Sequence, residues 1–242
     1  VITGLIAEEK EITIVAGVDP SPREGTPYPV YENLDACDVE ADVVIDFSSP
    51  VCTDALLDWC ADKQVPVVEC TTGLSEAQLA RIKETSAKVA VLKSANMSMG
   101  INLLEKLLKE AAGLLAEAGY DIEIVEKHHN QKVDAPSGTA LMIADAINAE
   151  AGNSYEYVYD RSQVRQKRGA QELGISSVRG GGIVGDHDVL FCGPEEVVTI
   201  SHVAQSRGVF ADGAVQAALF LDGCEPGYYT MTDMLKGKMQ CL

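Results

Sequence analysis

Short runs of β-branched residues alternate with helical patterns over the first part of the chain, and this alternation limits the folds open to it. Four runs rich in Val and Ile suit strands that are buried on both faces of a parallel sheet: residues 12–18, 43–47, 65–68 and 89–92. Helical periodicity fills two segments between them, 52–62 and 75–87, and Ser75 and Gln78 have the spacing of a capping box. Such alternation predicts an α/β fold built from βαβ units with right-handed crossovers.

The pattern changes in the second half of the chain. A long helix is predicted from residue 100 to about 118, followed by a half-exposed strand at 122–126 and a helix from about 138 to 150. Further strands, separated by glycine-rich turns, are predicted at 178–182, 189–192 and 197–202. We therefore expect two domains. Residues 1–98 and 208–242, with a final helix at 210–221, form an α/β domain, and residues 99–207 form an open α+β domain.

The chain is strongly acidic, with 37 acidic and 19 basic residues and a net charge of −18. This balance argues against a nucleic-acid or anionic-membrane partner, because such binding relies on Lys and Arg to neutralise phosphate. No apolar run reaches the roughly 18 residues that a membrane span needs. The seven cysteines are odd in number, lack Cys-x-x-Cys spacing and do not cluster with histidines as zinc ligands do. We expect free thiols, a cytoplasmic location and no metal site.

Two of the four histidines, His128 and His129, are adjacent, and Lys132 follows them closely. Neighbours at the end of a strand point to opposite faces, so the two imidazoles cannot do the same job. An imidazole titrates near neutral pH and suits proton transfer. By itself the pair also fits a polar turn with two surface histidines. The lysine and the helix start that follow favour a site that holds a small anion and gives it a proton.

The Pro-Ser-Gly-Thr turn at 136–139 opens that helix. The free N–H groups in the first turn of a helix attract a carboxylate or a phosphate. Either Asp134 or Ser137 can cap the helix instead. Anion binding and capping therefore both remain open for this turn.

Polar residues follow three of the strands predicted in the first domain. Asp19 comes directly after a strand, where a dinucleotide-binding sheet places the carboxylate that receives ribose hydroxyls, although Asp-Pro is also a common turn dipeptide. Ligands of such sheets bind beyond the carboxyl ends of the strands. Small or polar residues that can approach a nicotinamide ring stand there: Cys70, Thr71, Thr72, Ser94, Ala95, Asn96 and Met97. Each also fits ordinary strand-to-helix turn chemistry.

The whole segment 126–140 is similar to the signature of the dihydrodipicolinate reductase family, also called 4-hydroxy-tetrahydrodipicolinate reductases, with its His-His-x-x-Lys-x-Asp-Ala-Pro-Ser-Gly-Thr string. Further matches follow in the family's order: Asp46-Phe47-Ser48, Cys70-Thr71-Thr72-Gly73, residues 94–100, Val184-Gly185-Asp186-His187, Ser206-Arg207 and Phe210-Ala211. The resemblance covers essentially the whole chain.

This resemblance implies a Rossmann-like domain that binds NADH or NADPH and an α+β domain that binds a small cyclic dicarboxylate and forms a homotetramer. The implied reaction belongs to lysine and diaminopimelate biosynthesis. It implies that His128 is the proton donor and acceptor, that Lys132 is a second proton donor, and that His129 binds substrate. Gly138 and Thr139 would hold a carboxylate. Residues 70–72 and 94–97 would line the nicotinamide side, and Asp19 would meet the adenosine ribose.

The chain departs from the family pattern at its start. The family opens with a strand and a Gly-x-x-Gly-x-x-Gly turn that cradles the cofactor pyrophosphate, whereas residues 1–6 resemble the helix after that turn. We expect about 15–20 residues of the natural protein, including the central strand, to precede this sequence, because a sheet without its middle strand exposes two unpaired edges. A true truncation would put cofactor binding in doubt. Pro20 stands where some relatives carry an Arg that suits a 2′-phosphate, and with Asp19 this favours NADH. Arg23 nearby weakens that inference, so NADH and NADPH both remain open.

Two other functions compete with the reductase. One is a non-catalytic binding protein or sensor for an anionic metabolite or a dinucleotide, which the departure at the start favours. The other is a different Rossmann dehydrogenase acting on another small acid. The adjacent histidines disfavour the second, because most such enzymes need only one histidine.

Overall fold

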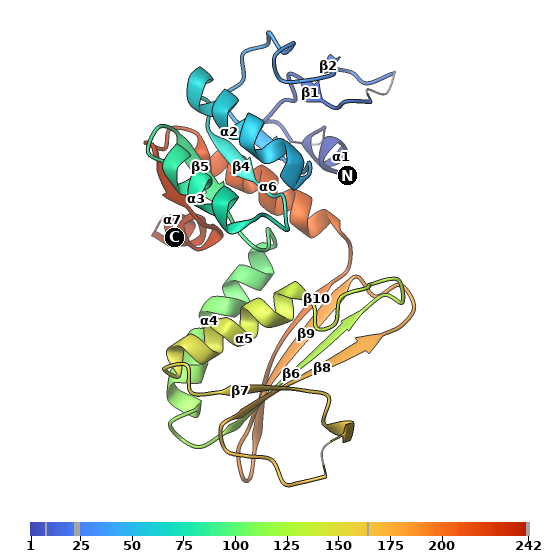
Figure 1. Cartoon of the computed structure of the whole chain (residues 1–242), viewed down its shortest axis with the longest axis vertical. Helices are drawn as coiled ribbons and strands as arrows, with labels where there is room; N and C mark the ends of the chain where they lie inside the picture. Colours follow the sequence, from blue (N-terminus) through green and yellow to red (C-terminus); the bar gives the residue numbers. More distant parts are fainter. Residues whose placement is uncertain (8, 22–24, 164, 241–242) are drawn as a thin grey trace. The chain divides into compact units, whose positions relative to one another are not determined.

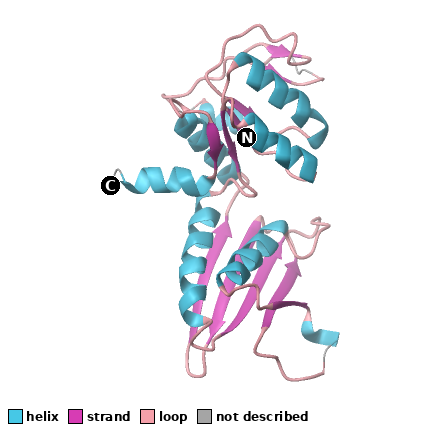
Figure 2. Cartoon of the chain, turned by 60° about the vertical axis from the view of Figure 1, so that its left-hand side comes forward, coloured by secondary structure: helices cyan, strands magenta, loops and turns pink. Residues whose placement is uncertain are grey.

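The computed structural model describes residues 1–7, 9–21, 25–163 and 165–240. The chain divides into two compact units (Figure 1). Unit 1 comprises Val1–Ser98 and Gly208–Leu242, and unit 2 comprises Met99–Arg207. Each unit combines helices with a sheet (Figure 2), and the predicted α/β class is confirmed.

Unit 1 is built around four parallel strands in the order β11-β5-β4-β3. Their bounds are β3 Val44–Asp46, β4 Val67–Glu69, β5 Ala90–Lys93 and β11 Gly227–Tyr229. Helices α2 (Pro50–Lys63) and α3 (Glu76–Thr85) share one apolar core with this sheet, and α6 (Gly208–Leu221) packs against β3, β4 and β5. The return of the final helix to the first sheet is confirmed, and so is the capping box between Ser75 and Gln78.

The remaining elements of unit 1 are short. Helix α1 spans Ile2–Ile6, α7 spans Met231–Gln240, and β1 (Gly17–Val18) pairs in parallel with β2 (Val30–Tyr31) outside the four-stranded sheet. The strand predicted at 12–18 is therefore wrong for residues 12–16. A strand needs a hydrogen-bonding partner, and among the described residues only β2 pairs with this segment, at its last two positions.

Unit 2 contains a five-stranded sheet in the order β10-β9-β6-β8-β7. The strands are β6 Asp121–His128, β7 Glu156–Tyr159, β8 Glu172–Arg179, β9 Gly185–Cys192 and β10 Val197–Ala204. Helices α4 (Met99–Leu115) and α5 (Gly138–Glu150) cover one face, where apolar residues of β6, β8 and β9 join their core. A 3-10 turn, Arg161–Gln163, follows β7. Burial alternates along β6, as predicted for a half-exposed strand.

Some strand predictions in unit 2 miss their place. The strand expected at 178–182 ends at Arg179, because residues 180–182 form a glycine turn in which Gly181 has a left-handed φ of 51°. The main part of β8 lies earlier, where polar residues break the apolar pattern. Strands β7 and β11 and helix α7 were not predicted, because short segments with few or no buried residues give little periodicity.

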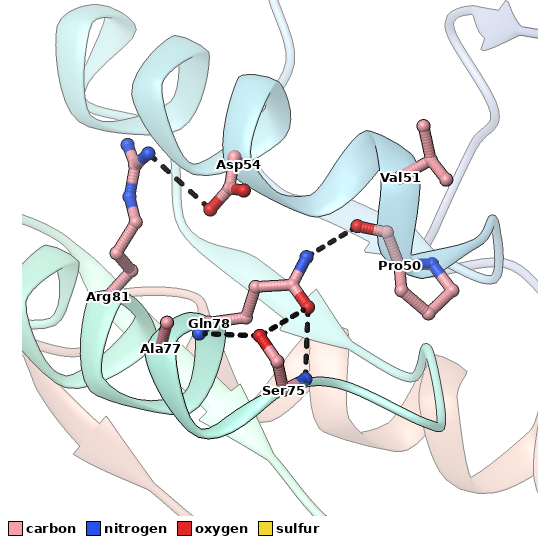
Figure 3. Close-up of a pocket in the computed structure, with 7 residues that line it drawn as sticks. All are labelled: Pro50, Val51, Asp54, Ser75, Ala77, Gln78 and Arg81. Atoms are coloured by element: carbon pink, nitrogen blue, oxygen red, sulfur yellow. Dashed lines mark hydrogen bonds and ion pairs between the residues drawn. The ribbon is translucent and has the colours of Figure 1, made fainter.

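Helices α2 and α3 enclose a surface pocket of about 510 Å³ (Figure 3). Its lining consists of Pro50, Val51, Asp54, Ser75, Ala77, Gln78 and Arg81. The Gln78 amide donates to the Pro50 carbonyl at 2.5 Å, and Arg81 pairs with Asp54 at 3.4 Å. These contacts tie the two helices together. None of the residues predicted to bind cofactor or substrate lines this pocket.

Candidate active site

His128 is the last residue of β6, and its ring is held by the preceding inward-facing residue of the same strand. The Glu126 carboxylate contacts Nδ1 of His128 at 2.6 Å, and the two residues are 0% and 8% exposed. An ionised carboxylate can only accept a hydrogen bond, so Nδ1 carries the hydrogen. The other ring nitrogen, Nε2, is thereby left to exchange a proton with a ligand.

Glu126 is also the centre of a larger network. Both of its oxygens accept hydrogen bonds from the Arg179 guanidinium, each at 2.7 Å, and its Oε1 accepts the backbone N–H of Ser137 at 3.1 Å. Burial alone would raise the pKa of Glu126, but hydrogen bonds from Arg179, Ser177 and His128 outweigh it and lower the pKa to about 2. Glu126 is therefore a permanent anion beside His128 at any physiological pH.

A second imidazole lies against the first. The rings of His128 and His187 meet edge to face with centroids 5.3 Å apart, and Nε2 of His187 lies 3.0 Å from the Ser137 hydroxyl. Burial lowers the pKa of His187 to about 4, with a further contribution from His128, so His187 is neutral near pH 7. His187 thus acts as an uncharged wall of the site that fixes Ser137.

Ser137, rather than Asp134, caps α5: its hydroxyl accepts the Ala140 N–H at 3.1 Å. Gly138 and Thr139 are the first two residues of this helix. Because Ser137 also bonds Glu126 and His187, the start of α5 is fixed against the end of β6. The helix N-terminus and His128 therefore belong to one rigid cluster.

Lys132 and His129 lie in the turn between β6 and α5. The Lys132 ammonium pairs with Asp134 at 2.9 Å, and this hydrogen bond lowers the pKa of Asp134. His129 is half-buried, and its Nδ1 has no hydrogen-bond partner among the described residues. His128 is buried and His129 is less so, and the different roles predicted for the two histidines stay a prediction.

The polar residues predicted in unit 1 follow β4 and β5. Cys70 and Thr71 are buried, Thr72 is exposed, and a Cβ at Gly73 (φ 76°) would meet nothing within 4 Å, so the backbone there is open to a ligand. Asn96 is 9% exposed, its Oδ1 accepts the Ser98 N–H at 2.8 Å, and the Ser94 hydroxyl donates to the Asn96 carbonyl at 2.8 Å. Ala95 is exposed and Met97 is buried within this turn.

Three charged residues that sequence reasoning did not select surround Thr71. Its N–H donates to Glu69 at 2.9 Å and its hydroxyl donates to Asp46 at 2.7 Å. The Lys93 ammonium donates to its carbonyl oxygen at 2.6 Å. All the polar atoms of Thr71 are thus held by charged side chains. The available signal was a charged residue at the end of each of three otherwise apolar strands.

Glu126 and Arg179 were also missed as site residues. The alternation of β6 places Glu126 on the buried face two residues before His128, where a charge needs a partner. That partner, Arg179, lies beyond the reach of any local pattern, because it comes from β8, which pairs with β6 only in the folded sheet.

Asp19 is exposed directly after β1, and its Oδ1 accepts the Ser21 N–H at 2.8 Å, as in an Asx turn. Arg23 lies outside the described residues. Across the described ranges, no three His, Cys, Asp or Glu residues come together in a way that would hold a metal ion. Nor does any helix within those ranges have the length and apolarity to cross a membrane.

Comparison with known proteins gives a consistent family. Residues 1–97 match the family described as "Dihydrodipicolinate reductase, N-terminus", and residues 100–235 match "Dihydrodipicolinate reductase, C-terminus". The 4-hydroxy-tetrahydrodipicolinate reductase of Caldanaerobacter subterraneus subsp. tengcongensis is 53% identical over 98% of this chain and 93% of its own length. The enzyme of the same name from Clostridium tetani is 48% identical over 97% of this chain and 91% of its own length.

Solved structures agree with this assignment. Dipicolinate-bound dihydrodipicolinate reductase from Paenisporosarcina sp. TG-14 is 25% identical, with a TM-score of 0.78 over 94% of this chain and 91% of that chain. An oxidoreductase from Agrobacterium radiobacter, 11% identical, shares the fold alone, with a TM-score of 0.54 over 97% of this chain and 88% of that chain. Together, the matched residues and the identities show that the chain belongs to the dihydrodipicolinate reductase family.

Proposed function

We propose that this chain reduces 4-hydroxy-tetrahydrodipicolinate to tetrahydrodipicolinate with NADH or NADPH, a step of lysine and diaminopimelate biosynthesis. Family membership and the name shared by its relatives support the reaction. The observation that carries the proposal is the contact between Glu126 and His128, which leaves Nε2 of a buried imidazole for proton transfer.

In this proposal unit 2 holds the cyclic dicarboxylate. Lys132, His129 and the first N–H groups of α5, at Gly138 and Thr139, are the groups for its carboxylates. The Lys132 ammonium has an anionic partner already, Asp134, which is 58% exposed. A substrate carboxylate can replace Asp134 there, because an exposed ion pair is worth little in water.

His128 gives the proton that the reaction needs, with Lys132 as a second donor. The ring is oriented by Glu126, whose negative charge also stabilises the imidazolium form that His128 must adopt to give a proton. His187 is neutral, so it does not compete for that proton.

Unit 1 binds the pyridine nucleotide, which when bound supplies the hydride. The chain's residues fit such a group: small side chains and an open backbone at residues 70–73 and the hydrogen-bonded turn at 94–98 follow adjacent parallel strands. Asp19 would receive the adenosine ribose hydroxyls. Titration with each cofactor decides between NADH and NADPH.

We further propose a homotetramer in a reducing cytoplasm. The face of the unit 2 sheet that is not covered by α4 and α5 carries exposed apolar side chains, which are 45%, 56% and 60% exposed at Val178, Val197 and Val203. Exposed apolar side chains on an open sheet face favour association with a second copy. The described cysteines are all free thiols. Light scattering of the purified protein measures the number of subunits.

The test is an absorbance assay at the nicotinamide band with 4-hydroxy-tetrahydrodipicolinate supplied. Oxidation of NADH or NADPH that depends on this substrate supports the reductase. Binding of cofactor and dipicolinate without any oxidation would instead support a non-catalytic sensor.

A further inference from the structure

Asp46, Glu69 and Lys93 form one row across the parallel sheet of unit 1, which we call the charged row. Asp46 is aligned with Glu69 in the pairing of β3 with β4, and Glu69 with Lys93 in that of β4 with β5. Aligned residues of parallel strands point to the same face. Two residues earlier on that face stand Val44, Val67 and Val91, which belong to the core shared with α2 and α3. The charged row therefore interrupts a face that is otherwise apolar.

The charged row holds Thr71 at each of its polar atoms. The Thr71 N–H donates to Glu69 at 2.9 Å and its hydroxyl donates to Asp46 at 2.7 Å, while its carbonyl oxygen accepts from Lys93 at 2.6 Å. Thr71 itself is 4% exposed and is the second residue after β4. Two buried carboxyl groups and a half-buried ammonium cost more to place here than a neutral anchor for Thr71 would, which points to a role beyond stability.

The charged row contains two carboxyl groups and one ammonium in a buried setting. Glu69 is 0% exposed and Asp46 is 6% exposed. One oxygen of Glu69, Oε1, accepts the Thr71 N–H, while Oε2 is buried and finds no donor. A proton on Oε2 removes this mismatch, because it converts the orphaned acceptor into a donor that can reach Asp46. One shared proton also makes the row neutral overall.

We propose that the charged row is a positioning device for Thr71 in cofactor binding, and that it holds Thr71 in place only while Asp46 and Glu69 share a proton. This inference rests on the proposed function in one respect, namely that residues 70–72 face the nicotinamide. Asp46, Glu69 and Lys93 are positioning residues, since they act through Thr71.

The charge environment gives the proposal a pH dependence. Burial, helped by the neighbouring Asp46, raises the pKa of Glu69 to about 7, although the Thr71 N–H and Lys93 oppose the shift. The groups facing Glu69 are Asp46 from β3, Lys93 from β5, the Cys60 thiol from α2 and the adjacent Cys70 thiol. Burial raises the pKa of both thiols, so they stay neutral. Above neutral pH the row therefore carries two adjacent carboxylates against one ammonium.

The test measures NADH affinity by energy transfer from the single tryptophan, Trp59, between about pH 6 and about pH 9. If NADH binds only while Glu69 and Asp46 share a proton, the Kd of the wild type for NADH rises by up to about tenfold per pH unit above the pKa of Glu69. Glu69→Gln keeps an acceptor for Thr71 and supplies a permanent donor for Asp46. Its Kd is expected to match the low-pH wild type and to stay constant with pH. Glu84→Gln on the exposed face of α3 is the matched control and should follow the wild type.

A second measurement needs no cofactor. Infrared difference spectra of the protein alone should show the carbonyl stretch of a protonated carboxyl group that disappears near neutral pH in the wild type and is absent in Glu69→Gln. If Glu69→Gln fails to fold, the infrared titration of the wild type and the pH dependence of its Kd for NADH together test the proposal. An affinity independent of pH in the wild type, or an unchanged slope in Glu69→Gln, would overturn the proposal, and so would the lack of any protonated carboxyl band.

The outcomes also separate this inference from the proposed function. A protein that reduces the substrate but binds NADH equally at every pH contradicts the inference alone. A protein without turnover whose NADH affinity follows Glu69 contradicts the reductase alone. No binding of either NADH or NADPH at any pH contradicts both.

Discussion

Gly185 lies against the ring nitrogen of His128 that is left for proton transfer: a Cβ at Gly185 would lie 3.0 Å from Nε2. Gly185 begins β9, on the strand that also carries His187. The backbone of β9 thus lies so close to the imidazole that a side chain at this position would crowd the ring. Because Gly185 has no Cβ, the space around Nε2 stays open.

Gly185→Ala is therefore expected to lower kcat by roughly tenfold or more, because the new methyl group crowds Nε2 or displaces the ring by a few tenths of an ångström. The affinity for cofactor should not change. Gly113→Ala is the control, since a Cβ at Gly113 in α4 meets nothing within 4 Å and should slightly stabilise the helix. Steady-state kinetics measure both variants. A Gly185→Ala enzyme with full kcat would show that Nε2 does not need this space.

Glu126→Gln tests the orientation of His128. The amide keeps the size of the side chain but removes the charge that accepts from Nδ1 of His128 and pairs with Arg179. We expect kcat to fall by roughly 10²-fold or more, with an altered pH profile, since the imidazolium form loses its counter-charge. Glu156→Gln, on the exposed side of β7, should leave kinetics unchanged. If kcat of Glu126→Gln had the same pH dependence as that of the wild type, Glu126 would have only a structural role.

Acid should destabilise unit 2 in two stages. His187 has its pKa lowered from 6.5 to about 4, mainly by burial, so it binds fewer protons when folded. Its contribution to the free energy of unfolding is present above pH 6.5 and is lost as the pH falls towards 4. The total loss is on the order of 3 kcal/mol. Glu126, with its pKa lowered from 4.5 to about 2, adds a second loss below pH 4.5.

Thermal unfolding as a function of pH measures this effect. His187→Gln places an uncharged amide near the Ser137 hydroxyl and should flatten the decrease in Tm between about pH 6.5 and about pH 4. His129→Gln, at a half-buried position outside the network, should retain the decrease. Equal acid sensitivity of His187→Gln and the wild type would mean that another group binds the proton.

The contrast between β4 and residues 12–16 shows how far the sequence determines this fold. Both segments are β-branched, but β4 has partners on both sides, whereas residues 12–16 have none among the described residues. The apolar pattern of the sequence therefore identifies candidate strands, and hydrogen-bond pairing in the folded protein decides which candidates become strands. The segment 128–139 could be identified as a site because its groups are close in sequence. Of the two residues that could cap the following helix, Asp134 and Ser137, the structure shows that Ser137 does so.

The groups that tune each site could not be found in the same way. Arg179 reaches Glu126 across the pairing of β6 with β8, and Lys93 reaches Thr71 from the next strand of the sheet. Such contacts depend on strand order and register, which local patterns do not fix. A buried charge at a strand end, as at Glu69, was the one signal that pointed to them.

The most direct test of the account is turnover of His128→Gln with NADH and NADPH at saturating 4-hydroxy-tetrahydrodipicolinate. The account predicts that kcat falls by roughly 10²–10⁴-fold, the range for a lost general acid–base, while the Kd for the cofactor stays within about twofold of the wild type. Full turnover by this variant, measured beside a wild type that oxidises the cofactor, would contradict the assignment of His128 as the proton donor.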